Sequence, residues 1–267
     1  MRALEALAAV LVVVLCVLLL CGAAPAPEAL TLAQPVAGWQ DAYLNFLDSH
    51  YDTFAYLWPD GMSGVGFVDL DLDGTPEMIV FDQGASATLG AQFFDLVNGQ
   101  VYCVSSVLDA ADGAFDGTYM SPVDVCTSFF ESFRLSWTAD GWRFWVDSAN
   151  GTMETAWDQI VRFDSVDGVL TPVDVCYRYL EFDPDSGLVV SEQYTAAGVP
   201  TDAAGYDGAA GGYMDAQDAG YDAAGVFLWN DMDRYDTSRE GLMAMARDAV
   251  SAYRPIADYV TAATLLP

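Results

Sequence analysis

The sequence predicts an α+β fold in which an antiparallel, β-rich central sheet is flanked by an N-terminal and a C-terminal helix. Three features support this prediction: apolar residues at helical spacing before residue 55, alternating apolar and polar residues around short turns in the middle of the chain, and a second helical pattern near its end. We expect six or more strands between Val65 and Tyr194, within a helix-plus-β domain that spans residues 30–195.

The first helix is predicted to run from Trp39 to Leu47. Its apolar residues Trp39, Tyr43, Phe46 and Leu47 recur at intervals of three and four positions. This spacing places them on one face of a helix. One amphipathic helix should therefore precede the sheet.

Hairpin patterns fill the middle of the chain. Residues 93–97 and 101–104 flank Asn98-Gly99, a pair whose positive φ angles match the twist of two antiparallel strands. Alternation of large apolar and polar residues predicts further strands. These lie at residues 133–137, 142–146, 159–163, 175–182 and 188–194.

Two segments of different character follow these strands. Residues 196–225 are rich in Ala, Gly and Asp, and so little apolar surface predicts an exposed, flexible segment. Residues 226–267 are predicted to be a C-terminal helical segment, in which Thr237 to Glu240 fit a capping box. We expect its helix to run from Ser238 to Tyr253 and to stop before a proline.

Residues 1–29 have the pattern of a signal peptide or an N-terminal anchor. Their apolar run, residues 6–20, is shorter than the roughly 18 residues expected of a membrane-spanning helix. Cleavage after Ala23 or after Ala33 is the first alternative, and a lipid on Cys21 is the second. Both alternatives place the protein in an extracellular or cell-surface location.

The charge of the chain restricts its partners. It has 9 basic residues, all arginine, and 39 acidic residues, for a net charge of −30. Such a field repels phosphate backbones and anionic lipids and attracts divalent cations. We therefore expect no nucleic acid as a partner, and no membrane beyond an N-terminal anchor or lipid. The absence of lysine also excludes Schiff-base chemistry.

One loop has a pattern suited to calcium. Residues 69–77 read Asp-Leu-Asp-Leu-Asp-Gly-Thr-Pro-Glu. Alternating carboxylates can surround one Ca²⁺ with six to eight oxygens at about 2.3–2.6 Å if the chain turns sharply at the glycine. A polar turn with solvated aspartates is the alternative, but a turn does not need three aspartates in alternation. We predict a calcium site formed by Asp69, Asp71, Asp73, the Thr75 carbonyl and Glu77.

This loop resembles known calcium loops. An EF-hand has a bidentate glutamate at its twelfth position and continues into a helix, whereas this chain has Val80 there and a predicted strand at 78–81. The loop is more similar to the β-loop-β loops of FG-GAP (integrin-type and VCBS) repeats. It is also similar to the Asp-x-Asp-x-Asp-Gly-x-Pro-Glu segment of uncharacterised exported bacterial proteins, which likewise open with a helix bearing Trp and Tyr. The resemblance covers about residues 39–105, lacks propeller repetition, and implies calcium as the cofactor.

The cysteines beyond the leader are Cys103, Cys126 and Cys176. Residues 121–126 and 171–176 resemble each other, which makes Cys126–Cys176 the favoured pair for a disulfide. Buried free thiols are the alternative.

Two functions remain open from the sequence. The first is an exported, acidic, non-catalytic surface or binding module that calcium stabilises and that takes a carbohydrate or protein ligand. The alternative is a secreted, glycosidase-like hydrolase that uses a carboxylate pair, although no pair stands out among so many acids. A single histidine, His50, makes histidine-dependent catalysis a poor hypothesis. Four tryptophans offer surfaces for sugar stacking, but strand alternation assigns most of them to a core: Trp137, Trp142, Trp145 and Trp157.

Overall fold

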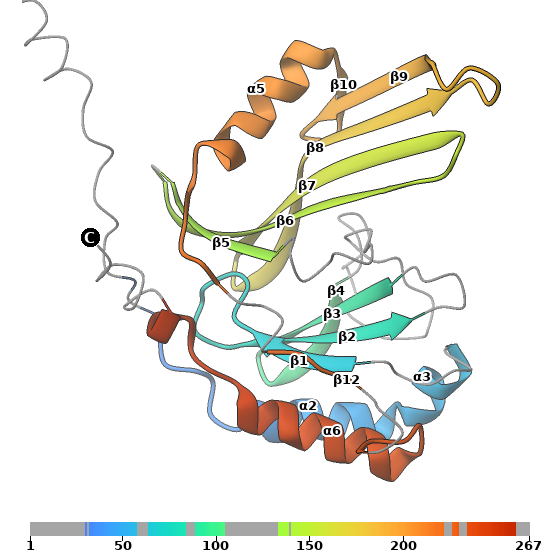
Figure 1. Ribbon diagram of the computed structural model, residues 1–267. Coiled ribbons are helices and arrows are strands. Elements are labelled where there is room, and N and C mark those ends of the chain that lie inside the picture. The colour runs from blue at the N-terminus through green and yellow to red at the C-terminus, as the bar shows by residue number, and fades with distance from the viewer. Residues whose placement is uncertain are drawn as a thin grey trace, which may run out of the picture.

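The computed structural model describes residues 30, 32–57, 64–83, 89–104, 133–138, 140–221, 226–229 and 234–259. Within these ranges the chain forms two antiparallel sheets and several helices, arranged in layers (Figure 1). The α+β class and the antiparallel pairing are confirmed. The strands are divided between two sheets rather than joined in one, because α2 and α6 cover one face of the first sheet while the second sheet covers the other.

The first sheet has the strand order β12-β1-β2-β3-β4, and helices cover one of its faces. The predicted N-terminal helix is present as α2, and the predicted C-terminal helix as α6. The α6 cap is Ser238, whose hydroxyl accepts a hydrogen bond from the Gly241 N–H at 3.1 Å. The elements of this part are α2 (Trp39–Ser49), α3 (Tyr51–Leu57), β1 (Gly64–Val68), β2 (Glu77–Gln83), β3 (Leu89–Val97), β4 (Gln100–Val104), β12 (Leu228–Trp229) and α6 (Arg239–Ala252).

The second sheet has the strand order β10-β9-β8-β7-β6-β5-β11. Its strand pairing shifts register at Ile160/Val161 between β7 and β8 and at Glu181/Phe182 between β8 and β9. Helix α5 lies against one of its faces (Figure 1). The elements are β5 (Phe133–Thr138), β6 (Gly141–Gly151), β7 (Thr155–Val166), β8 (Val169–Phe182), β9 (Val189–Ala196), β10 (Val199–Thr201), α5 (Ala203–Met214) and β11 (Gln217–Asp218).

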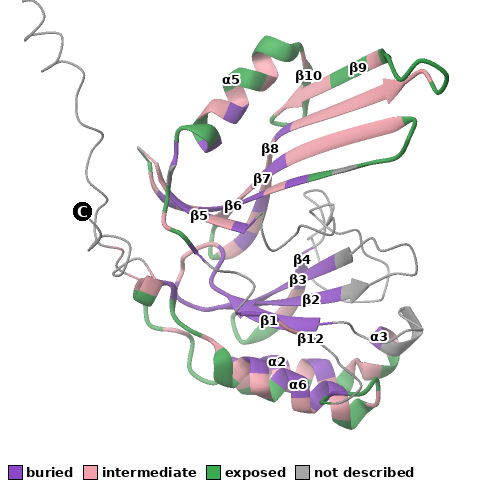
Figure 2. Cartoon of the chain, in the orientation of Figure 1, coloured by how far each residue is buried: buried purple, intermediate pink, exposed green. Residues whose placement is uncertain are grey.

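Successive side chains of the first sheet point into two different cores. Phe67 of β1 packs with α2 and α6, whereas its neighbour Val68 packs between the sheets with Phe93 and Phe163. All five residues of β1 are buried as a result (Figure 2). The first sheet therefore has no solvent-facing side along this strand.

The expectation of a flexible segment at residues 196–225 is wrong for its described part, residues 196–221, which forms β10, α5 and β11. Alanine has the highest helix propensity of any residue, and the Asp202 carboxylate caps α5 by accepting the Gly205 N–H at 2.9 Å. Ala210 and Tyr213 are buried against the second sheet. A few contacts on one face thus order a segment whose composition looked too polar to fold.

The predicted leader, residues 1–29, and Cys126 lie outside the described ranges. Cys176 is a buried free thiol, so the favoured Cys126–Cys176 disulfide is not formed and the alternative of a buried thiol holds for this cysteine. Burial raises the pKa of this thiol to about 11. Within the part of the chain that is described, no helix combines the length and apolarity needed to cross a membrane.

Candidate cation site

The predicted calcium loop connects β1 to β2 at one end of the first sheet. Val68 pairs with Glu77, which closes the loop at its base. Two residues within it have left-handed backbone conformations, Leu72 with φ 62° and Gly74 with φ 100°. These two positive φ angles bend the loop so that Asp69, Asp71 and Glu77 converge. The sequence pattern predicted such a bend at the glycine.

The segment before α2 lies across the loop. The Val36 N–H donates a hydrogen bond to the Thr75 hydroxyl at 3.2 Å. A Cβ atom placed on Gly74 would lie only 2.2 Å from the Ala33 carbonyl oxygen. Glycine is therefore required at this position both for its φ angle and for the close approach of another backbone.

Three carboxylates converge inside the loop. Asp69, Asp71 and Glu77 each offer an oxygen, and these oxygens lie within 4.8 Å of one another. Asp69 and Glu77 are buried, and Asp71 is half-buried. This arrangement brings three acidic groups together where little water can screen their charges.

Backbone N–H groups satisfy these carboxylates only in part. Oδ2 of Asp69 accepts the Gly74 N–H at 3.1 Å, and Oε2 of Glu77 accepts the Leu70 N–H at 2.5 Å. Oδ1 of Asp69 is buried and has no hydrogen-bond partner within the described ranges. A buried oxygen of this kind normally has a partner, and a cation at the centre of the group would supply one.

The pKa values of these groups reflect burial and mutual repulsion. Burial, followed by the charge of Asp71, raises the pKa of Asp69 to about 8. Burial and the charge of Asp73 raise the pKa of Asp71 to about 6, and burial raises the pKa of Glu77 well above its ordinary range. Without a cation, ionising all three groups is therefore costly.

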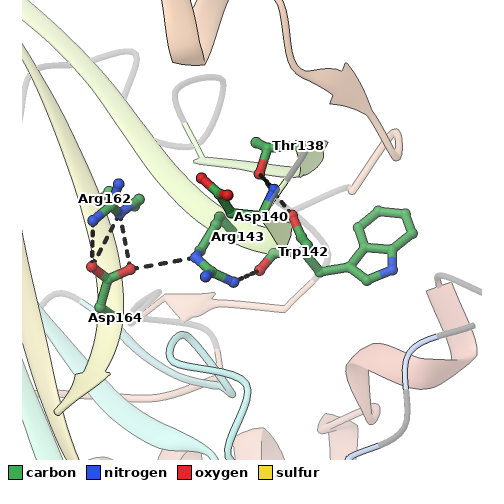
Figure 3. Close-up of polar contacts among 7 residues, drawn as sticks. Thr138, Asp140, Trp142, Arg143, Arg162 and Asp164 are labelled. Carbon is green, nitrogen blue, oxygen red and sulfur yellow. Dashed lines mark hydrogen bonds and ion pairs between the residues drawn. The ribbon is translucent and has the colours of Figure 1, made fainter. Parts of the chain in front are cut away.

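Arginine does not neutralise this cluster. Among the described residues, every ion pair lies elsewhere, as in the bridge from Asp164 to Arg162 at 2.6 Å and to Arg143 at 3.5 Å (Figure 3). Similar pairs join Arg178 to Asp158, Arg234 to Asp248 and Arg239 to Asp48. Within the described residues, the loop is thus an acidic centre with no arginine at ion-pair distance.

The other two predicted ligands are placed differently. Oδ1 of Asp73 accepts the Thr75 N–H at 2.7 Å, which stabilises the turn, and Asp73 is not in the close group of three. The Thr75 hydroxyl is occupied by Val36. Coordination by Asp73 and by the Thr75 carbonyl remains a prediction.

Sequence reasoning missed a fourth acid, Asp95 of β3. It is buried, burial raises its pKa, and its charge raises the pKa of Glu77. Because Phe94 pairs with Met78, the next residue of β3 faces the Glu77 end of β2. The available signal was a lone acid between apolar residues in a predicted strand.

The second sheet contacts the same site through the turn between β7 and β8. The Leu170 N–H donates to Oδ2 of Asp95 at 2.8 Å, and the Ser165 side chain hydrogen-bonds to Asp71. The cluster therefore lies where the first sheet meets a hairpin of the second.

Other candidates from the sequence have structural roles. His50 ends α2, and its Nδ1 lies 2.9 Å from the Phe46 carbonyl oxygen. Trp142 and Trp145 are buried in cores, as alternation predicted. Neither the histidine nor these tryptophans contribute to the loop.

Comparisons with known proteins found no match: no family model, no curated protein and no solved structure resembles the chain. The candidate site therefore has to be judged on its own geometry.

Proposed function

We propose that this protein is an exported, acidic, non-catalytic binding module whose loop at residues 69–77 binds Ca²⁺ and thereby stabilises the fold. The observation that supports this proposal is the buried Oδ1 of Asp69, which has no partner in the described chain and belongs to a group of three converging carboxylates. The donors are all hard oxygens, the type that Ca²⁺ prefers, and sulfur or imidazole ligands for transition metals do not occur in the group.

The export and surface location are part of the proposal. They rest on the leader pattern at residues 1–29 and on the net charge of −30. Extracellular calcium is abundant enough to fill sites with dissociation constants of about 10⁻⁴ to 10⁻³ M.

The same geometry makes a hydrolase the weaker hypothesis. A glycosidase needs two carboxyl groups on either side of a substrate bond. Here the acids with the most strongly raised pKa values, Asp69 and Glu77, are buried and hydrogen-bonded to the loop backbone. A sugar cannot reach them without unfolding the loop, whereas an ion can be enclosed by it.

Calorimetric titration of the purified chain with CaCl₂ tests the proposal. We expect one site, and melting that shifts upward by several degrees, since a ligand at a hundred times its dissociation constant stabilises by about 2.7 kcal/mol. Asp69→Asn should abolish binding, because it removes the charge of the buried ligand while keeping its shape. In chelator this variant should melt above wild type, since it relieves repulsion.

The matched control is Asp140→Asn in the exposed β5–β6 turn, which should bind calcium as wild type does. Absence of binding up to millimolar calcium, with melting unchanged by chelator, would show that the loop is only a turn.

A further inference from the structure

The N-terminal strap, residues 30 and 32–36, precedes α2 and packs on the folded domain. The side chains of Leu30 and Leu32 are partly buried against the core between the two sheets. Residues two positions apart point to the same side of an extended chain, which allows both leucines to reach one core. The first residues of a domain are usually poorly ordered unless contacts of this kind hold them. The folded domain therefore includes Leu30.

The strap also lies directly on the predicted calcium loop. The Val36 N–H donates a hydrogen bond to the hydroxyl of the buried Thr75 at 3.2 Å. The Ala33 carbonyl oxygen lies so close to Gly74 that a Cβ atom there would come within 2.2 Å of it. At the other end of the strap, the Val36 carbonyl accepts the Trp39 N–H at 3.3 Å, and Trp39 is buried beneath α6. The strap is thus fixed on both sides of its contact with the loop.

This packing distinguishes the two cleavage sites that the leader pattern allows. Cleavage after Ala33 would remove Leu30, Leu32 and the Ala33 carbonyl from the folded domain and uncover part of the core. Cleavage after Ala23 leaves the whole strap in place, as does a lipid on Cys21. The earlier cut also gives a leader of 23 residues, within the usual range of about 15–30, whereas the later cut gives a leader of 33. Packing and leader length therefore both oppose the later site.

We infer that the export leader is removed upstream of Leu30, and that the mature protein keeps residues 30–36 as a strap over the predicted calcium loop. The inference rests on the proposed export but not on calcium binding. By holding Gly74 and Thr75, the strap stabilises the bend that brings the acids of the loop together.

The N-terminus of the exported protein tests this inference. The full chain is exported from a bacterial host and analysed by intact mass and N-terminal sequencing. We expect it to begin at Ala24, or at Cys21 with the added mass of a lipid, because both keep the strap. A start at Gln34, or anywhere after Leu30, would overturn the inference and leave the export proposal standing, as would an exported chain with its leader intact. A chain that stays in the cell with its leader intact would overturn both.

Melting in chelator measures what the strap contributes, without any contribution from calcium. A chain that begins at Gln34 should melt at least about 5 °C below one that begins at Ala24, because it loses two leucines from the core. Within the longer chain, Leu32→Ala should lower the melting temperature by at least about 3 °C. The matched control is Val36→Ala, at a side chain of the same strap that is 45% exposed, and it should shift melting by less than about 1 °C.

If the chain that begins at Gln34 fails to fold, Leu32→Ala and its control carry the comparison. Equal melting of the two chains, or of wild type and Leu32→Ala, would show that the strap is not part of the folded domain and would overturn the inference. Calcium calorimetry of the wild-type chain reports separately on the cation site. A strap that stabilises a chain without calcium binding would leave this inference standing and refute the calcium proposal.

Discussion

The two sheets of this protein differ in how much of their surface is covered. The first sheet is enclosed by helices on one side and by the second sheet on the other, so even polar residues such as Gln92 and Asp95 are buried there. The long strands of the second sheet extend past this contact, and no residue of β9 is buried (Figure 2). Buried charge is costly without a partner. The buried acids of the first sheet thus need a partner such as the proposed cation, whereas polar side chains on the second sheet can interact with water.

The largest effect is expected where the two sheets meet. Phe93→Ala removes a ring whose centroid lies 5.5 Å from that of Phe163, and such a truncation costs about 3–5 kcal/mol. Urea unfolding should show this loss in a single transition, because both sheets share the core. Val199→Ala, at a side chain that is 63% exposed, should change stability by less than about 0.5 kcal/mol. Two separate transitions in wild type would show that the sheets fold independently.

Alanine substitutions at two glycines allow the enclosed loop to be compared with an exposed turn. Gly74→Ala meets both a positive φ and the Ala33 carbonyl, whereas Gly168→Ala, in the β7–β8 turn, meets a positive φ of 75° with nothing within 4 Å. We expect a cost of about 2–4 kcal/mol for the first and about 1–2 kcal/mol for the second. Thermal melting of both variants measures the difference, and equal costs would mean that the N-terminal segment does not rest on the loop.

The buried acids predict an unusual pH dependence in chelator. The pKa of Asp69 is raised to about 8 and that of Asp71 to about 6, so between pH 4 and these values the folded chain keeps protons that the unfolded chain has lost. The contribution of these acids to the free energy of unfolding should therefore be fully present at low pH and be lost as the pH rises toward 8. We expect the melting temperature in chelator to be several degrees lower at pH 8 than at pH 5.

Calcium should reverse this trend, because it binds the deprotonated carboxylates. In chelator, Asp69→Asn should make the melting temperature depend less on pH. If the pH profiles in calcium and in chelator run parallel, the acids do not share an ion.

The smallest effect is expected for helix α5, which packs on one face of the second sheet. Asp202→Ala removes the N-terminal cap of α5, which should cost about 1 kcal/mol and speed hydrogen exchange in residues 203–214. Exchange in β1 and β2 should stay unchanged, since α5 contacts only the second sheet among the described cores. Equal acceleration in both sheets would argue against this separation.

Local patterns in the sequence predicted the elements but not their assembly. The spacing of Trp39, Tyr43 and Leu47 predicted α2, and Asn98-Gly99 predicted the turn between β3 and β4, where both residues have positive φ. These signals depend on neighbours in the chain. The division into two sheets depends on which apolar faces meet, and that is decided by contacts such as Phe93 with Phe163, far apart in the sequence.

The candidate site could likewise be predicted only for residues that lie close together in the chain. Asp69, Asp71 and Glu77 belong to one short motif, so the sequence alone brings them together. Asp95 reaches the cluster through strand pairing, and Ser165 through the packing of the second sheet. Neither can be inferred from spacing. The α5 segment was mispredicted because composition measures average hydrophobicity, whereas Ala210 and Tyr213 stabilise the helix through one face only.

The order of the strands also affects how the chain can fold. Gly64 in β1 pairs with Trp229 in β12, and α6 packs on the same sheet, so more than half of the chain separates these partners and the entire second sheet is inserted between them. Closing so long a loop is slow, because its entropy is lost before the contacts form. The first sheet therefore stays open at its β1 edge until nearly the whole chain has been synthesised. The pairing of β1 with β12 is therefore one of the last strand contacts that the growing chain can complete.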